Sequence, residues 1–302
     1  MSEIRRIGFA GTSSWAAEAL RLLHARAELE LAIVLSQPDR PAGRGRTPAP
    51  PAVAVVAREL GLPLLQPERP ADGLAELAEA RVDAFALVAY GGLVPRPLLD
   101  LAPWFNVHPS LLPRWRGAAP IERSLMAGER ESGVAVMLMV EALDAGPIAA
   151  LERFEVPSDA DAGWVYARAL ALAIEPLAVA LATDAVPTVP QVGEASYAHR
   201  ILAEDRLLEP ARPAAALHDQ VRALAPAIGA RLGLGGALNT VWRARPAAAP
   251  VAQGTLSVVD GALLLGCADS SLELVELQPP AKARMSAGPW LRGLRGALPE
   301  VS

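Results

Sequence analysis

The sequence predicts an α/β protein with two folded domains, a doubly wound domain with a mostly parallel sheet and a smaller C-terminal β-barrel. Three observations favour this fold class. The chain has 302 residues, which is above the usual size of one compact domain. Over residues 4–156, short apolar runs alternate with amphipathic stretches, a rhythm typical of βαβ units. Toward the C-terminus, short runs follow one another between glycines and prolines, as in small barrels.

Seven strands are expected in the first domain, because seven runs are rich in apolar or β-branched residues. They cover residues 6–10, 29–35, 62–65, 83–89, 104–108, 134–139 and 149–156. The first helix should begin after Thr12 or Ser13, either of which can act as N-cap. Its inner face would consist of Ala16, Ala19, Leu20 and Leu23. A second helix is predicted over residues 51–60, where a proline begins the segment and Gly61 follows it.

The remaining elements lead to the predicted barrel. A long helix is expected over residues 161–183, with a kink at Pro176 because proline removes a backbone hydrogen bond. Residues 185–213 are irregular and contain several prolines, so we interpret them as a linker. A further helix is indicated by the helical spacing of Ala215, Leu217, Val221 and Leu224. Five short strands then follow at 228–232, 240–245, 254–259, 262–265 and 272–277.

Composition and charge exclude several classes of protein. Hydrophobic residues make up 52% and charged residues 20% of the chain, which excludes global disorder. The apolar stretch at 170–182 contains Glu175 and Pro176 and is shorter than the roughly 20 residues that cross a bilayer, so no membrane span is expected. The N-terminus lacks the apolar core of a secretion signal, which favours the cytoplasm. The net charge of -5 is not that of a basic nucleic-acid-binding module.

Common sites for metals, nucleotides and covalent nucleophiles are not indicated. Cys267 is the single cysteine, and the four histidines are too far apart for common metal-binding pairs, so we expect a metal-free protein. Residues 8–11 (Gly-Phe-Ala-Gly) lack the third glycine of dinucleotide-binding loops. The chain contains neither a Gly-Lys-Ser/Thr sequence nor a Gly-x-Ser-x-Gly elbow.

The polar segment at residues 105–121 is the strongest candidate for a functional site, because it overlaps the end of a predicted strand. Residues two apart on a strand share a face, so Asn106 and His108 should project together at its carboxyl end. Open α/β sheets bind ligands at that edge. Asp144 follows the apolar strand that ends at Met139, and we expect this strand to deliver Asp144 toward the same edge.

An amide, an imidazole and a carboxylate, with neither a cysteine nor a serine in a nucleophile elbow nearby in the sequence, fit acyl transfer by direct attack of an external amine. The amide of Asn106 can donate to a developing oxyanion, and the imidazolium of His108 can donate to it or protonate the leaving nitrogen. The carboxylate of Asp144 can orient the imidazole. Each residue alone also has an ordinary explanation, His108 as a hydrogen-bonded structural histidine and Asp144 as a turn residue.

The residues around this trio resemble those of a known family. The similarity to the active-site core of the folate-dependent formyltransferases lies in FNVHPSLLPRWRGAAPI at 105–121, followed by GVAVMLMVEALDAGPI at 133–148. Three further segments resemble the members that formylate the methionine carried by initiator tRNA. These are IGFAGT at 7–12, QPDRPAGRGR at 37–46 and VAYGGLVP at 88–95.

The resemblance spans nearly the full chain and implies its organisation. A Rossmann-like catalytic domain would cover residues 1–188, a linker 189–207 and an OB-like barrel 208–302. The implied reaction is transfer of a formyl group from 10-formyltetrahydrofolate to the α-amine of methionyl initiator tRNA, through a tetrahedral intermediate. The implied partners are this tRNA and tetrahydrofolate. We expect a monomer without metal or membrane attachment.

The resemblance also implies roles for individual residues. Asn106 and His108 would polarise the formyl group, while Asp144 would tune His108 and assist removal of a proton from the amine. The tetrahydrofolate site would be lined by Val88, Ala89, Tyr90, Ser110, Leu111, Leu112 and Pro113. The residues expected to approach the acceptor end of tRNA are Arg40, Arg44 and Arg46. Arg114 and Arg116 are candidates for contacts either to a ligand or within the loop.

Three departures from the family pattern favour keeping two alternatives. Ser13-Ser14-Trp15 stands where the family usually has proline, an acidic and an aromatic residue, and Ala145 stands in place of a threonine. The C-terminal domain is nearly neutral where that of the family is basic. One alternative is a folate-dependent formyltransferase that acts on a sugar nucleotide or another small-molecule amine. The other is a catalytically silent folate- or RNA-binding protein.

Overall fold

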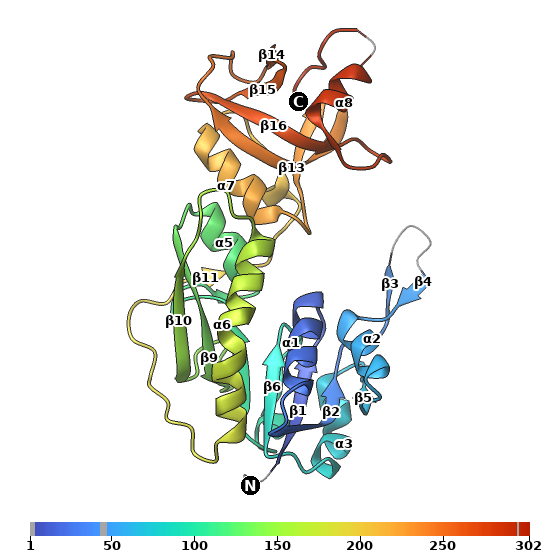
Figure 1. Ribbon diagram of the computed structural model, residues 1–302, viewed down its shortest axis with the longest axis vertical. Helices are drawn as coiled ribbons and strands as arrows, with labels where there is room; N and C mark the ends of the chain where they lie inside the picture. The colour runs from blue at the N-terminus through green and yellow to red at the C-terminus, as the bar shows by residue number, and fades with distance from the viewer. Residues whose placement is uncertain (1–3, 43–46, 295) are drawn as a thin grey trace. The chain divides into compact units, whose positions relative to one another are not determined.

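A seven-stranded sheet forms the centre of the N-terminal part of the computed structural model, which describes residues 4–42, 47–294 and 296–302 (Figure 1). The strands lie in the order β10-β9-β7-β6-β1-β2-β5. Their bounds are β1 Arg5–Gly11, β2 Leu29–Leu35, β5 Leu64–Leu65, β6 Ala84–Val88, β7 Trp104–His108, β9 Glu131–Leu138 and β10 Ile148–Glu155. All seven runs that the sequence analysis assigned to strands are therefore present.

The sheet is mixed: most of its neighbouring strands are parallel, and two strands at one edge are antiparallel. The five neighbouring strands from β5 to β7 pair in parallel. β9 runs antiparallel to β7. β9 and β10 form a hairpin, because Leu138 N–H donates to Pro147 O and Val156 N–H donates to Arg130 O, both at 2.9 Å. An antiparallel pair thus occupies one edge of a parallel sheet.

Helices border this sheet. Their bounds are α1 Ser14–His24, α2 Ala52–Glu59, α3 Leu74–Glu79, α4 Arg96–Leu99 and α6 Ala162–Ala182, with the 3₁₀ turn η1 Pro70–Gly73 before α3. Ser13 caps α1, since its hydroxyl accepts from Ala16 N–H (3.2 Å). The predicted inner face of α1 is buried, with Ala17 in addition. α6 continues without interruption through Pro176.

Two glycines of β1 show that the helices lie on both faces. A Cβ on Gly11 would lie 2.8 Å from the Cβ of Ala16 on α1. A Cβ on Gly8 would lie 2.2 Å from the ring of Phe85, which belongs to a core cluster that includes residues of α3 and α4. Because side chains alternate along a strand, positions 8 and 11 face opposite sides. α1 therefore covers one face, and α3 and α4 cover the other.

The first part of the predicted linker belongs to the N-terminal unit. Val189 and Ile148 exchange two backbone hydrogen bonds (2.8 and 2.9 Å). Farther on, β11 Tyr197–Ala198 pairs with β8 Arg116–Gly117 in a short ladder. A second short ladder joins β3 Arg40–Ala42 to β4 Thr47–Ala49. The sequence patterns predict neither ladder.

The chain divides into two units, and each unit is built from three separate segments of the chain. The described residues of 1–118, 133–154 and 166–197 form one unit, and those of 119–132, 155–165 and 198–302 form the other. Two segments from the middle of the chain thus join the C-terminal unit. The domain boundaries at 188 and 207 stay a prediction.

The C-terminal unit contains a second, antiparallel sheet. Its strands follow the order β12-β13-β16-β15-β14, and β17 pairs with β16. The elements are α5 Pro120–Met126, η2 Glu204–Arg206, α7 Ala214–Leu224, β12 Ala230–Leu234, β13 Ala237–Ala247, β14 Leu256–Val259, β15 Ala262–Gly266, β16 Ser271–Gln278, β17 Met285–Ser286 and α8 Ala287–Arg292. Leu217, Val221 and Leu224 of α7 join its core. Within the described residues no ladder joins β12 to β14, so closure into an OB-like barrel stays a prediction.

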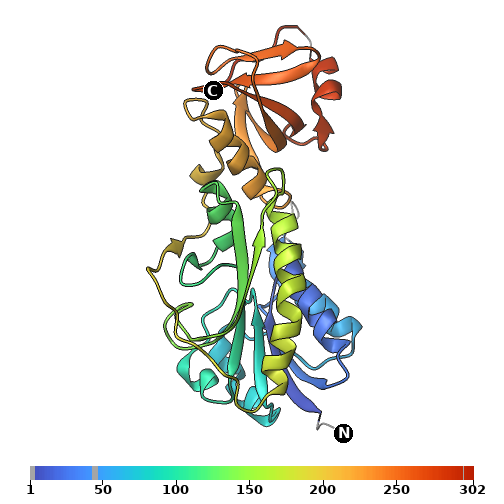
Figure 2. The ribbon, with the colours of Figure 1, turned by 60° about the vertical axis from the view of Figure 1, so that its left-hand side comes forward.

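α6 is the one helix of the described chain that is long and apolar enough to cross a membrane (Figure 2). The core helix of a folded domain meets the same criterion. A stripe of α6 is fully buried at Ala169, Ala173, Leu177 and Leu181. This spacing of four residues is that of a helix packed on one side.

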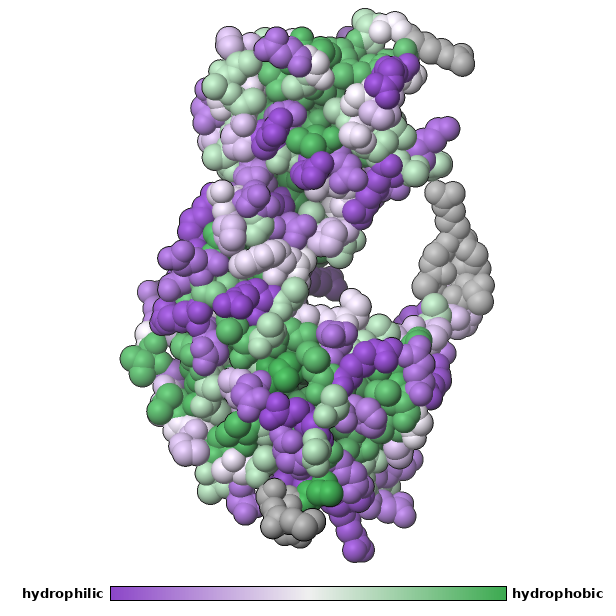
Figure 3. Space-filling view, viewed as in Figure 1, coloured by the Kyte–Doolittle hydropathy of each residue, from purple (hydrophilic) through white to green (hydrophobic). Residues whose placement is uncertain are grey.

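The face drawn in Figure 3 shows apolar residues interspersed with polar ones over both units.

Gly8→Ala is expected to lower the free energy of unfolding by about 1–3 kcal/mol, because the new Cβ would overlap the Phe85 ring. Gly73→Ala is the matched control, since φ at Gly73 is -93° and the nearest neighbours of a Cβ would lie at 3.6–3.9 Å. Urea denaturation of both variants measures the difference. Equal stability of Gly8→Ala and the unaltered protein would contradict the contact between Phe85 and β1.

Candidate active site

Two buried polar side chains project from β7. Asn106 and His108 lie two residues apart and share a face of the strand, with exposed fractions of 8% and 4%. On neighbouring strands, Leu87 of β6 and Met137 of β9 lie opposite Asn106. A polar group among apolar neighbours is costly unless it is hydrogen-bonded. Asn106 therefore needs a partner.

The carboxylate of Asp144 is that partner. Asn106 Nδ2 donates to Asp144 Oδ1 (3.3 Å), and His108 Nδ1 lies 3.6 Å from Asp144 Oδ2. Asp144 is itself 92% buried, with an exposed fraction of 8%. The three residues that the sequence analysis selected thus lie together in the structure. Their catalytic roles stay a prediction.

Asp144 reaches the other two residues by an unexpected route. Because β9 is antiparallel to β7, its last residue, Leu138, lies opposite Phe105 near the start of β7. The expectation that this strand delivers Asp144 to the carboxyl edge of the parallel strands is therefore wrong. The loop of residues 139–147 folds back along β7 instead, and this return places Asp144 beside Asn106 and His108.

The backbone at Asp144 lies in the left-handed region, with φ of +48°. Residues other than glycine seldom adopt this conformation, and surrounding contacts must hold it. Gly117 N–H donates to Asp144 Oδ2 (2.8 Å). Gly146 passes so close to β9 that a Cβ on it would lie 1.8 Å from Leu138 O. The turn is thus held on both sides of the carboxylate.

Both ring nitrogens of His108 face protein groups. Nε2 lies 2.8 Å from Trp115 O. Because a carbonyl oxygen only accepts, Nε2 carries the hydrogen and donates it. Nδ1, which binds the second proton when the ring is charged, faces Asp144. The tautomer and the orientation of the ring are therefore set by Trp115 and Asp144.

Gln191 connects the two loops of the site. Its Nε2 donates to Asp144 O and to Gly146 O, each at 2.8 Å. Its Oε1 accepts from Arg116, at 2.7 Å from Nη2 and 3.2 Å from Nε. Arg116 thus stabilises the loop, which is one of the two roles considered for it.

Ser196 holds the loop that follows β7. Trp115 N–H donates to Ser196 Oγ (2.9 Å), and backbone hydrogen bonds join Ser196 to Arg116 (2.8 Å) and Pro113 (3.3 Å). No sequence pattern indicated Gln191 or Ser196 as part of the site. Their partners lie up to 83 residues earlier in the chain, and a single sequence has no periodicity that relates such distant positions.

The residues after β7 that were predicted to line the tetrahydrofolate site are mostly turned inward. Ser110 is 3% exposed, and its hydroxyl donates to Arg114 O (2.7 Å). Leu112 belongs to a core cluster with residues of β9 and β10, Pro113 is buried and Leu111 is half-buried. Contact between these residues and a planar ligand would therefore come mainly from their backbone. That contact stays a prediction.

The predicted ligand residues after β6 differ in exposure. Val88 is fully buried, whereas Ala89 is exposed, with φ of +42°. The carbonyl of Tyr90 accepts from Thr12 Oγ1 (2.6 Å). The Tyr90 ring is 1% exposed, and its hydroxyl has no partner among the described residues. Burial raises the pKa of Tyr90 to about 12.

The arginines predicted to approach tRNA are described only in part. Arg40 is exposed, and its Nη2 lies 3.5 Å from the Glu68 carboxylate. Arg44 and Arg46 lie outside the described residues. Arg40 is therefore the one member of this group with a defined position.

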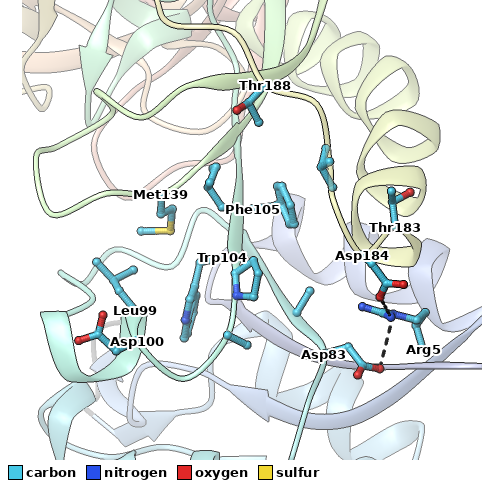
Figure 4. A pocket seen from close by; sticks show the side chains of 15 residues that line it. Arg5, Asp83, Leu99, Asp100, Trp104, Phe105, Met139, Thr183, Asp184 and Thr188 are labelled. Atoms are coloured by element: carbon cyan, nitrogen blue, oxygen red, sulfur yellow. Dashed lines mark hydrogen bonds and ion pairs between the residues drawn. The ribbon is translucent and has the colours of Figure 1, made fainter.

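A separate cleft of about 510 Å³ lies at the amino-terminal edge of the parallel strands (Figure 4). Arg5, Ala84 and Trp104 line it from the beginnings of β1, β6 and β7, and Arg5 pairs there with Asp83 and Asp184. Its described lining includes none of the predicted site residues.

Among the described residues, no group of three His, Cys, Asp or Glu side chains could hold a metal ion. The metal-free state stays a prediction.

Two family models match the chain. The model described as formyl transferase matches residues 5–181, which include the Asn106, His108 and Asp144 trio. The model described as formyl transferase, C-terminal domain, matches residues 200–295. Gln191 lies between the two matched regions.

Similar proteins align with nearly the whole chain. A protein from Thermus thermophilus named methionyl-tRNA formyltransferase is 39% identical over 296 residues, which are 95% of this chain and 96% of that protein. A protein of the same name from Paracoccus denitrificans is 38% identical over 302 residues, with 98% and 99% covered. The crystal structure of HypX from Aquifex aeolicus in complex with tetrahydrofolic acid has a TM-score of 0.66 at 16% identity, over 99% of this chain and 51% of HypX. At that identity, the similarity to HypX shows a shared fold.

Tyr90→Phe is expected to leave the free energy of unfolding unchanged at pH 7 or to raise it by up to about 1 kcal/mol, because the hydroxyl is buried without a partner. The two proteins should diverge at high pH. An unfolded tyrosine ionises near pH 10, whereas burial holds the pKa of folded Tyr90 at about 12. The unaltered protein therefore loses stability as the pH rises from about 10 to 12, and Tyr90→Phe lacks this loss.

Urea denaturation at pH 7 and pH 11 measures this effect. Tyr197→Phe is the control, because Tyr197 is 57% exposed. Parallel pH profiles for the unaltered protein and Tyr90→Phe would contradict the buried, unpaired phenol.

Proposed function

The chain belongs to the formyl transferase family, and we propose that it transfers a formyl group from 10-formyltetrahydrofolate to the α-amine of the methionine carried by initiator tRNA. The resemblance inferred from the sequence motifs is confirmed by the family models and by relatives that align along nearly the whole chain. The observation that carries the chemistry is the contact of one buried carboxylate, Asp144, with both Asn106 and His108.

The reaction exchanges one carbon–nitrogen bond for another. The uncharged amine attacks the formyl carbon, a new C–N bond forms, and the carbonyl oxygen becomes an oxyanion. Collapse of this tetrahedral intermediate breaks the bond to the donor nitrogen, which leaves with a proton. The protein must therefore stabilise an oxyanion, accept a proton from the amine and supply one to the leaving nitrogen.

Asn106 is placed to stabilise the oxyanion. One hydrogen of its Nδ2 is donated to Asp144, and the other makes no hydrogen bond in the described part of the chain. Because the first bond fixes the amide plane, the second hydrogen has a set direction before substrate binds. Preorganised donors of this kind stabilise developing negative charge with little reorganisation.

Asp144 and His108 are placed to transfer protons during the reaction. Asp144 accepts the proton of the attacking amine, directly or through one water molecule. The Nε2 hydrogen of His108 points at Trp115 O, so an oxyanion that accepts this hydrogen must compete with that carbonyl. Nδ1 faces Asp144, so a proton taken up by the carboxylate can pass to the ring, and the imidazolium that results can protonate the leaving nitrogen.

The residues at the carboxyl ends of β6 and β7 fit a planar folate donor. Ala89 is exposed beside the buried Val88, and the side chains of residues 110–113 are mostly turned inward, so backbone groups are left to meet a ring. The shared fold with HypX, whose crystal structure contains tetrahydrofolic acid, supports this donor. We assign the tetrahydrofolate site to residues 88–90 and 110–113, with Tyr90 contributing through its backbone.

The remaining proposals concern the architecture. Residues 1–188 would form a Rossmann-like catalytic domain, 189–207 a linker and 208–302 an OB-like barrel that contacts tRNA together with Arg40, Arg44 and Arg46. The match of the C-terminal family model to residues 200–295 supports the last of these domains. We propose a metal-free, cytoplasmic monomer that is not attached to a membrane.

Asn106→Ala, His108→Ala and Asp144→Ala are each expected to lower kcat by about 10²–10⁴-fold, because each removes a preorganised group from the transition state. Transfer of a labelled formyl group to methionyl initiator tRNA measures the loss, and circular dichroism checks the fold. Asn239→Ala, at a buried asparagine of the C-terminal sheet, is the matched control and should keep kcat near that of the unaltered protein. Near-normal turnover in all three variants would refute the assignment.

Arg40→Ala is expected to weaken tRNA binding a few-fold and to reduce the slope of log Kd against log salt by about 1, as for the loss of one phosphate contact. Arg69→Ala is the control, since Arg69 is also exposed and paired with an acidic neighbour. Filter binding over a range of salt concentrations measures both.

Assays of amino sugar nucleotides as acceptors test the substrate class. Efficient formylation of those amines but not of charged tRNA would favour the small-molecule alternative.

A further inference from the structure

Gln191 joins the Asp144 turn to the loop after β7, although it lies in the segment between the two regions matched by the family models. Its two amide atoms have different partners. Oε1 faces Arg116, which can only donate, and Nε2 faces the carbonyl oxygens of Asp144 and Gly146, which can only accept. This arrangement permits one orientation of the amide, so Gln191 acts as a rigid link.

The link bears directly on the carboxylate. Asp144 has a left-handed backbone, and rotation of its peptide toward a relaxed conformation would swing the carbonyl away from Gln191. The same rotation would carry the carboxylate away from Asn106 and from Gly117 N–H. The bonds from Gln191 to residues on both sides of Ala145 oppose this movement.

We propose that Gln191 is a positioning residue that keeps the Asp144 carboxylate against Asn106 and His108. It touches neither substrate and acts through the backbone of the 144–146 turn. The inference rests on the proposed function, because it takes Asp144 as a participant in the reaction.

Gln220 supplies a matched control within the same chain. Its Nε2 donates to Asp205 O (2.9 Å) and Leu207 O (2.8 Å), and its Oε1 accepts from Arg212 (2.9 Å). The chemical arrangement is the same as at Gln191. All of these partners lie in the C-terminal unit, away from the catalytic trio in sequence and in contacts.

Gln191→Ala is expected to lower kcat by about 10–100-fold, the usual effect of losing a partner that orients a functional group, with KM for either substrate nearly unchanged. Gln191→Glu keeps the length and the acceptor for Arg116 but cannot donate to the two carbonyls, so it should lose as much activity. Gln220→Ala should lower the unfolding midpoint and leave kcat near that of the unaltered protein. Normal kcat in both Gln191 variants, or an equal loss in Gln220→Ala, would overturn the proposal.

A double-mutant cycle tests whether Gln191 acts through Asp144. In the Asp144→Ala background, Gln191→Ala should cause no further loss of kcat, because there is no carboxylate left to position. Fully additive losses would mean that Gln191 acts independently of Asp144 and would refute the proposed role.

Hydrogen exchange gives a measurement that does not depend on activity. Gly117 N–H donates to the Asp144 carboxylate, so its exchange should be faster in Gln191→Ala and unchanged in Gln220→Ala. Unaltered protection of Gly117 in Gln191→Ala would contradict the proposal. If the unaltered protein formylates no methionyl-tRNA, the proposed function fails, and the exchange experiment still decides whether Gln191 holds the turn.

Discussion

The burial of the Asp144 carboxylate is the constraint on which the rest of the site depends. A buried carboxylate is costly unless donors surround it. Asn106 Nδ2 and Gly117 N–H donate to it, and His108 Nδ1 lies opposite it. These donors come from β7 and from the loop beyond it, so the carboxylate cannot keep its place unless both segments keep theirs. The same contacts that pay the cost of burial also align the amide and the imidazole.

The antiparallel direction of β9 makes this arrangement possible. The chain leaves β9 near the start of β7, and the loop of residues 139–147 extends along β7 and returns before β10 begins beside the end of β9. This return carries Asp144 past Asn106. It also presses Gly146 against Leu138 O, where there is no space for a side chain. A parallel strand would have ended at the other edge of the sheet, and its loop would have had no reason to lie over β7.

The sequence predicts the elements better than their directions. The run at 134–139 is apolar on both faces, which indicates a buried strand but contains nothing that distinguishes parallel from antiparallel pairing. The chain between β7 and β9, which contains α5, is long enough for a parallel or an antiparallel connection. The trio was found because Asn106 and His108 are two residues apart and because the segments around them resemble a family. Gln191 was missed because its role depends on contacts with residues 47 and 75 positions earlier, which no local pattern records.

The segment that was interpreted as a linker is irregular and also ordered, and the sequence alone does not separate these two properties. It is irregular, because its backbone pairs over short stretches with separate elements, at Ile148 of β10 and at β8, and not along the length of one strand. It is also ordered up to β11, because Gln191 and Ser196 satisfy backbone groups on both sides of the site. Irregular structure and freedom of movement are separate properties, and hydrogen bonding of the backbone decides between them. In this chain the residues that precede the C-terminal unit are part of the scaffold of the site, and changes there act on Asp144 without touching a substrate.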